Sequence, residues 1–396
     1  MTEPHVRHGT TLGDLARLFF KLGTIGFGGP AAHIALMEDE VVRRRQWLTR
    51  GAFLDYVGAT NLIPGPNSTE LAIEIGRDRA GWPGLIVAGV AFIVPAALIV
   101  GVTAWAYVRY GGLPAALALL AGVKPVVIAI VVQALWRLTK TAVKTAWLGA
   151  LALAAIVAVV VGVNELVVLL ASALVAAGVA AARVRSGDDR AAILSAAGVP
   201  RGIGTSPVAA ALGTAAAVPA AVSLWPLFAI FLKIGSVLFG SGYVLLAFLR
   251  ADFVQRLGWL TERQLLDAVA VGQVTPGPVF TTATFIGYVL AGVPGAVAAT
   301  VGIFLPAFVF VAVSGPLIPR LRRSHIAGPT LDGVNAASLG LMAVVTWQLG
   351  RASIVDVPTA ALAVSAGALL ATKRVNAALL ILGGAMAGIA LGMQLA

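Results

Sequence analysis

The sequence predicts an all-α, polytopic membrane protein with two homologous halves of about six helical segments each. Of its 396 residues, 59% are hydrophobic and 11% are charged, whereas soluble domains are about a quarter charged. Apolar runs such as 85–106 and 113–130 are long enough to cross a hydrocarbon core of about 30 Å. These runs lack the alternation of polar and apolar residues that is typical of outer-membrane barrels.

The second half of the chain repeats the first at an offset of 212 positions. The repeated motifs are Lys21-Leu22-Gly23 and Lys233-Ile234-Gly235, Trp47-Leu48-Thr49 and Trp259-Leu260-Thr261, and Pro64-Gly65-Pro66 and Pro276-Gly277-Pro278. Further along, the offset falls by one, so that Pro95 matches Pro306. A repeat of this length indicates duplication of one unit. We therefore divide the chain into a first repeat (1–185), a linker (186–224) and a second repeat (225–396).

Each half is expected to contain the same segments in the same order. In the first half, a glycine-broken segment spans 13–36 and a basic loop follows at 38–50. A helix near 52–62 then leads to the Pro-Gly-Pro break, after which a short helix is predicted near 67–76. Four more segments are predicted near 84–107, 113–136, 146–162 and 164–182 from their apolar runs.

The basic loops predict that the two halves are inserted in opposite orientations. Positive residues follow the second, fourth and sixth segments of the first half, but the third and fifth segments of the second half. Because cytoplasmic loops carry the positive excess, the second half should be inverted, as in transporters with inverted repeats. The linker must then cross the membrane, and 206–224 is the candidate. The loop after the first segment does not follow this pattern, because it is basic in both halves. The alternative for the broken segments is that they are re-entrant hairpins, which do not cross the membrane.

Composition also excludes several classes of function. The net charge of +11 comes from residues in short loops between apolar segments, so we expect no nucleic-acid partner. The chain has no cysteine, and its four histidines lack the spacing of metal ligands. We expect no metal, no cofactor and no enzymatic activity. The polar N-terminus, 1–11, predicts no signal peptide. No ATP-binding GxxxxGK[ST] motif is present, so uphill transport must draw on an ion gradient or a partner.

The helix breaks are the expected anion site. Helix N-termini present free N–H groups and a partial positive charge, and Gly28-Gly29-Pro30 and Pro64-Gly65-Pro66 each predict such a start. Asn67 or Ser68 is the expected N-cap of the second helix. We assign to anion binding the lysines, break backbone and nearby polar groups of both halves: Lys21, Gly28, Gly29, Asn67, Ser68, Lys233, Gly240, Ser241 and Thr275. The alternative for the lysines is that they reach an interface or pair with a carboxylate.

Lys124 is a further candidate for anion binding. It lies deeper in its apolar segment, is followed by Pro125, and has Asn335 as its counterpart in the second half. Lysine is costly inside a membrane segment, so an anionic ligand or partner is expected beside it.

Three carboxylates are candidates for proton coupling. Glu70 follows the first Pro-Gly-Pro and shares a helix face with Glu74, whereas the second half has no acid at the equivalent positions. The alternative for Glu70 is a salt bridge to Arg77 or Lys124. Asp55 and Asp267 are duplicated and follow the Trp-Leu-Thr motif, so capping or loop pairing is as well supported as transport chemistry.

These motifs resemble those of the chromate ion transporter family in its long-chain, two-domain form. The resemblance rests on 20–30, Leu62-Ile63-Pro64-Gly65-Pro66, Phe239-Gly240-Ser241-Gly242-Tyr243, Thr275-Pro276-Gly277-Pro278-Val279-Phe280, Phe285-Ile286-Gly287-Tyr288 and Phe304-Leu305-Pro306. It implies a multi-pass protein of the bacterial inner membrane that exports chromate, confers chromate resistance and draws on the proton motive force, as an antiporter would. The polar residues after the first Pro-Gly-Pro, Asn67-Ser68-Thr69-Glu70, depart from the expected pattern.

Two alternatives to chromate export remain open from the sequence. Sulfate has the shape and charge of chromate, so an importer of sulfate or another oxyanion is one, and sulfate is an expected competitor. A passive anion channel is the other, because half-helix termini also build channel filters. Besides the oxyanion, the expected partners are the lipid bilayer and a second copy of the chain in a homodimer.

Overall fold

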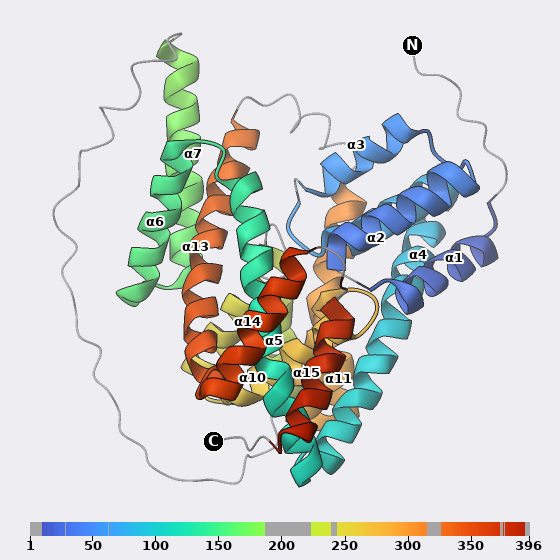
Figure 1. Ribbon diagram of the computed structural model, residues 1–396. Helices are drawn as coiled ribbons and strands as arrows, with labels where there is room; N and C mark the ends of the chain where they lie inside the picture. The colour runs from blue at the N-terminus through green and yellow to red at the C-terminus, as the bar shows by residue number, and fades with distance from the viewer. Residues whose placement is uncertain are drawn as a thin grey trace.

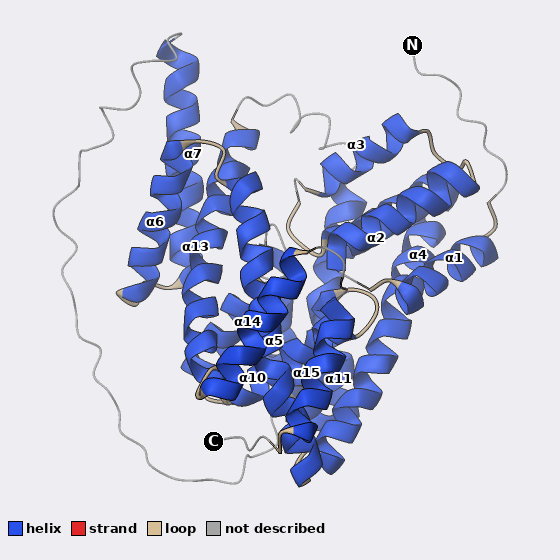
Figure 2. Ribbon diagram, in the orientation of Figure 1, coloured by secondary structure: helices blue, strands red, loops and turns tan. Residues whose placement is uncertain are grey.

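The computed structural model describes residues 10–27, 29–61, 63–186, 223–238, 244–314, 326–372, 375 and 377–392. The described residues form helices joined by turns, with no strand among them (Figure 2). The all-α prediction is therefore confirmed. The linker at 186–224, including the candidate crossing, lies outside the described residues except at its two ends.

The two halves contain the predicted series of segments. The elements of the first half are α1 (Leu12–Ile25), α2 (Gly29–Glu38), the π-helical turn η1 (Asp39–Arg44), α3 (Arg50–Thr60), α4 (Asn67–Tyr110), α5 (Pro114–Ala142), α6 (Ala146–Val160) and α7 (Glu165–Ser186). Those of the second half are α8 (Leu224–Val237), α9 (Leu245–Leu249), η2 (Arg250–Arg256), α10 (Glu262–Val274), η3 (Val279–Thr281), α11 (Thr282–Ser314), α13 (Ala327–Ser353), α14 (Val357–Ala371) and α15 (Ala377–Ala390).

The repeated Trp-Leu-Thr motif starts a helix in each half. The side chain of Thr49 accepts a hydrogen bond from the Ala52 N–H at the start of α3. Thr261 does the same for α10, where Gln264 completes a capping box. Such caps satisfy backbone donors that a helix start leaves open. The motif therefore fixes where α3 and α10 begin, which in turn positions the Pro-Gly-Pro turns at their ends.

The two helices predicted at 67–76 and 84–107 are present within α4, and the chain between them is not helical at Ala80 and Gly81. Gly81 has φ of +62° and ψ of −145°, a backbone conformation that is open almost only to glycine. A Cβ on Gly76, in the first helix, would collide with the Gly84 carbonyl of the second, so the two helices lie side by side after the turn. One predicted boundary is wrong: the basic loop predicted at 38–50 is partly helical, because α2 continues into the π-helical turn η1.

Four stretches of the described chain have the length and composition to cross a membrane: Asn67–Tyr110, Pro114–Lys140, Glu165–Ala182 and Val279–Ser314. Shorter apolar helices accompany them, among them α6, α8, α14 and α15. This is a multi-pass membrane protein. At 14 residues, α1 spans only about 21 Å, which is less than a hydrocarbon core.

The equivalent helices α4 and α11 run antiparallel to each other. Near the start of α4, the guanidinium of Arg77 donates to the carbonyl of Val311 near the end of α11, at 2.6 Å. Near the end of α4, the ring of Tyr107 lies 5.1 Å from that of Phe285 near the start of α11. The two halves therefore face each other along their longest helices.

The outer helices of each half pack on the other half. In Figure 1, α13 lies beside α6 and α7, and α5 lies between α14 and α15, as the helix contacts confirm. Each half thus completes the packing of the other. The largest core cluster accordingly contains residues of both, such as Val127 and Leu341.

Candidate functional site

The helix break of each half meets the Pro-Gly-Pro turn of the other half. The Gly65 N–H donates to the carbonyl of Leu238, and the Gly277 N–H donates to that of Gly26, both at 2.8 Å. These four residues occupy equivalent positions in the two repeats. The structure therefore brings the two predicted breaks together, by reciprocal hydrogen bonds between the halves.

Glu70 lies at this crossing and is fully buried. Its carboxyl group packs on Gly65, where a Cβ would collide with Oε1. No described residue hydrogen-bonds to either carboxyl oxygen, or to the buried hydroxyl of the neighbouring Thr69. Buried polar atoms nearly always have partners, so these three oxygens mark a site with unused bonding capacity.

The salt bridges considered for Glu70 are absent from the described residues, and that alternative is wrong. The Arg77 guanidinium lies 3.9 Å from Glu74 instead, and it also donates to the Val311 carbonyl. Lys124 pairs with Asp267. Both cations therefore have other carboxylates as partners, and the Glu70 carboxyl group lies against Gly65 of the Pro-Gly-Pro turn.

His33, on α2, is part of the site although its sequence context did not single it out. It is buried, its Nε2 lies 2.9 Å from the Gly26 carbonyl, and its Nδ1 lies 3.2 Å from the Ser68 hydroxyl. Because a carbonyl only accepts, Nε2 carries the proton, and the neutral ring then accepts from Ser68 at Nδ1. His33 therefore joins the first break to the start of α4. Its counterpart, Leu245, is apolar, so the repeat offered no signal for it.

Lys124, Asp267 and Tyr107 form a buried network between the halves. The Lys124 ammonium lies 3.2 Å from Asp267 Oδ1, with both side chains almost fully buried, and the Tyr107 hydroxyl donates to Oδ2 at 2.9 Å. These residues come from α5, α10 and α4. The structure thus pairs Lys124, a predicted anion ligand, with Asp267, a predicted proton carrier. The two residues lie far apart in the sequence, so no sequence pattern indicated this pair.

Lys21 and Lys233 each have a carboxylate partner. Lys21 Nζ lies 2.7 Å from Glu40, and Lys233 Nζ lies 2.5 Å from Asp252. The hydrogen bond from Lys21 holds the pKa of Glu40 below its usual range. Both acids lie at equivalent positions on η1 and η2, so the repeat contained the signal for these pairs. Lys21 is about half exposed. In the observed state both lysines pair with a carboxylate, which is one of the alternatives to anion binding that the sequence left open.

The remaining candidates are distributed around the crossing. Gly29 starts α2, but Gly28, Gly240 and Ser241 lie outside the described residues. The predicted side-chain cap of α4 is wrong, because Pro66 occupies the N-cap, Asn67 bonds to Asn61 and Ser68 lies against His33. The hydroxyl of Thr275 donates to its own helix at the end of α10.

Asp55, unlike its counterpart Asp267, is exposed on α3.

The two halves place different side chains at the crossing. Where the first half has His33, Ser68 and Glu70, the second has Leu245, Phe280 and Thr282. The polar groups of the crossing thus come mainly from the first repeat.

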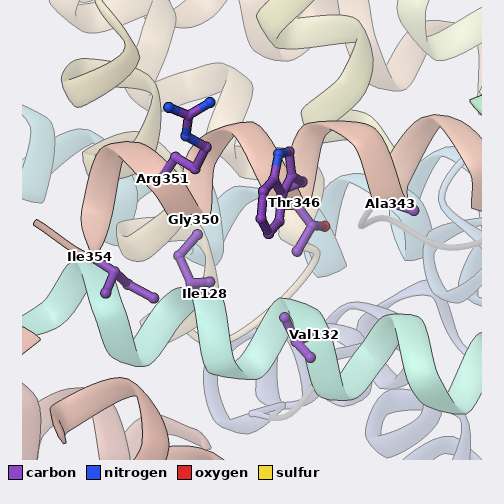
Figure 3. A pocket seen from close by; sticks show the side chains of 8 residues that line it. Ile128, Val132, Ala343, Thr346, Gly350, Arg351 and Ile354 are labelled. Atoms are coloured by element: carbon purple, nitrogen blue, oxygen red, sulfur yellow. The ribbon is translucent and has the colours of Figure 1, made fainter. Parts of the chain in front are cut away.

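A hollow of about 480 Å³ lies elsewhere, between α5 and α13 (Figure 3). Ile128 and Val132 line it from α5, and Ala343, Thr346 and Arg351 from α13. None of the predicted site residues lines this hollow, and its walls are mostly apolar. Arg351 is the charged side chain of its lining.

Comparison with known proteins identifies the family. The "Chromate transporter" family matches the chain twice, over residues 13–177 and 225–389. The chain is 34% identical over 388 residues to the chromate transport protein of Cupriavidus metallidurans, covering 96% of this chain and 93% of that protein. It is 32% identical over 381 residues to the chromate transport protein of Pseudomonas aeruginosa, covering 93% and 90%. A probable chromate transport protein of Synechococcus elongatus is 33% identical over 357 residues, with coverage of 90% and 88%.

No solved structure matches the chain. The family match covers one unit in each half of the chain. With its duplicated broken helices and their reciprocal contacts, the chain belongs to the chromate transporter family.

Proposed function

We propose that this protein is a secondary active transporter that exports chromate across the bacterial inner membrane, driven by the proton motive force, and thereby confers chromate resistance. The observation that carries the proposal is the reciprocal contact of helix breaks between the halves, in a chain similar to chromate transport proteins over most of its length. Broken helices are tolerated at membrane depth where they line a cavity or are buried in protein.

The two halves are inverted in the membrane and alternate access around the crossing. The antiparallel course of α4 and α11 supports this arrangement, as does the contact of Lys144, after α5, with Asp332 near the start of the equivalent helix α13. Inverted repeats of other transporters carry their substrate sites where the halves meet.

The chromate dianion binds to backbone N–H groups at the breaks and to nearby polar side chains. Gly28, Gly29, Gly240 and Ser241 supply backbone, Asn67, Ser68 and Thr275 supply side-chain donors, and Lys21, Lys124 and Lys233 supply positive charge. Each lysine must exchange its carboxylate partner for the anion during the cycle, since all three are paired in the observed state.

Glu70 carries the coupled proton, with Asp55 and Asp267 as further titrating groups. An ionised carboxylate without a partner is costly to bury, and the surroundings of Glu70 contain no charged partner among the described residues. A carboxyl that gains a proton in this state, and loses it when the crossing opens, links proton movement to conformation.

Proteoliposomes with an imposed pH gradient test this function. Wild-type protein should move chromate against its concentration gradient, and Glu70→Gln should retain chromate exchange at equilibrium while losing acceleration by the pH gradient. Glu165→Gln, on α7, is the matched control and should behave as wild type. Chromate movement that no gradient drives uphill would instead identify a passive channel, and inward movement with sulfate competition an importer.

A further inference from the structure

One face of α4 carries a line of carboxylates that runs from the surface to Glu70. Glu70, Glu74 and Asp78 are spaced four residues apart, so they share one helix face and rise by about 6 Å per step. Glu70 is fully buried, the Glu74 side chain is 14% exposed and Asp78 is exposed. Exposure thus falls stepwise along the line.

This line occurs only in the first repeat. The equivalent positions of α11 are Thr282, Ile286 and Leu290, none of which titrates. The duplicated scaffold, including the kink that follows, is kept in both halves. The three acids are therefore not needed to build this helix, and they lie in the half whose buried carboxyl group, that of Glu70, has no hydrogen-bond partner among the described residues.

The groups that face the line are few. Arg77 and Asp78 face Glu74, and Arg77 lies 3.9 Å from its carboxylate. Tyr56, on α3, faces Asp78 and also lies near Glu74 and Asp55. No charged group of the described residues faces Glu70. Within the described part of the chain, the inner end of the line is thus the one without an electrostatic partner, which makes it the end at which a proton is held.

We infer that Glu74 and Asp78 form the proton path between Glu70 and the surface at which Asp78 lies. Titratable side chains in membrane segments commonly act as proton relays. The proton moves as a single charge: Glu70 releases it, Glu74 accepts it and passes it to Asp78, and Asp78 releases it to water. By the positive-inside rule this surface is cytoplasmic, because Arg77 and Arg79 adjoin it. The inference rests on the proposed function, since it takes Glu70 as the proton carrier.

The test measures proton and chromate movement separately in proteoliposomes that contain a pH-sensitive dye. In Glu74→Gln, chromate-linked proton movement should fall by about tenfold or more, while chromate exchange without net proton movement stays at the wild-type rate. Glu74→Asp keeps a titrating group and should restore much of the proton flux. Asp78→Asn should slow proton movement and shift its pH profile, and Glu165→Gln should change neither.

This design distinguishes failure of the proposed function from failure of the proton path alone. Absence of chromate-linked proton movement in the wild type would overturn the proposed function itself. Normal proton movement in Glu74→Gln and Asp78→Asn, with loss in Glu70→Gln, would overturn only the path. If Glu74→Gln does not fold because Arg77 loses its partner, the double variant Glu74→Gln/Arg77→Gln removes both charges, and the same outcomes apply to it and to Asp78→Asn.

Discussion

At the scale of single residues, burial determines how much each ion pair contributes. Lys21 is half exposed beside Glu40, and such pairs contribute at most about 1 kcal/mol. Lys124 and Asp267 are almost fully buried, so neither charge can be removed alone without leaving the other uncompensated. The duplicated lysines, prominent in the sequence, are therefore less consequential for stability than the single Lys124.

Removal of one partner of the buried pair should be strongly destabilising. We expect Asp267→Asn to cost about 3–5 kcal/mol, because the Lys124 charge stays buried without a counter-ion. The double variant Lys124→Met/Asp267→Asn should recover most of that loss. Thermal unfolding of the purified variants in detergent measures both effects. A double variant no more stable than Asp267→Asn would show that the two charges are not coupled.

The pair of Lys21 and Glu40 should contribute a small, pH-dependent stability. Because the pKa of Glu40 is lowered in the folded protein, its contribution is present above the unfolded value of about 4.3. It is lost as the pH falls through the lower folded value. Glu40→Gln should therefore be less stable than wild type by about 1 kcal/mol or less at pH 7, and equally stable in strong acid. Unfolding midpoints measured from pH 7 down into strong acid test this, and a gap that does not narrow as the pH falls would contradict it.

At the scale of elements, the kinks of α4 and α11 position the breaks. Ala80 and Gly81 in α4 have nearly the same backbone angles as Ala291 and Gly292 in α11, so the bend is part of the duplicated unit. It separates the short helix that carries Glu70 from the long apolar stretch that follows. The sequence predicted the two helical pieces and the interruption between them, but not the close approach of Gly76 to Gly84 that places the two pieces side by side.

Gly81→Ala should therefore destabilise the protein by about 1–3 kcal/mol, since alanine is strained at this backbone conformation. Gly101→Ala, in the regular part of the same helix and with open space around it, is the matched control. It should be neutral or more stable by up to about 1 kcal/mol. Thermal unfolding compares them, and equal effects at both positions would show that the kink is not held by Gly81.

At the scale of the whole molecule, each half is completed by the other. The helix α13 packs on α6 and α7, and α5 packs on α14 and α15. Helices of each repeat therefore pack against helices of the other repeat. The opposing course of α4 and α11 extends this exchange to the crossing. Motion of one half against the other must therefore change the crossing.

Equivalent positions of the two halves should lie on opposite sides of the membrane. The chain has no cysteine, so Lys144→Cys and Val355→Cys, both at exposed and equivalent positions, give single reporters. An impermeant maleimide added to intact cells should label Val355→Cys, and labelling of Lys144→Cys should require opened membranes. Labelling of both from the same side would contradict the inverted arrangement.

The sequence by itself determined the membrane class, the two repeats and the places where helices break. These properties depend on local composition and on a constant offset, both of which can be read along one chain. It also determined which residue types lie beside the breaks, including Glu70, whose role as proton carrier stays a prediction.

Only the tertiary structure decided which groups meet. The Gly65 turn bonds to Leu238 rather than to its own half, Lys124 finds Asp267, and His33 reaches both Gly26 and Ser68. Apart from the contact of His33 with Gly26, these contacts join segments far apart in sequence, and their partners follow from tertiary packing, which no local pattern encodes. For the same reason, the buried carboxyl of Glu70 has no hydrogen-bond partner among the described residues, although Arg77 and Lys124 are candidate partners in the sequence.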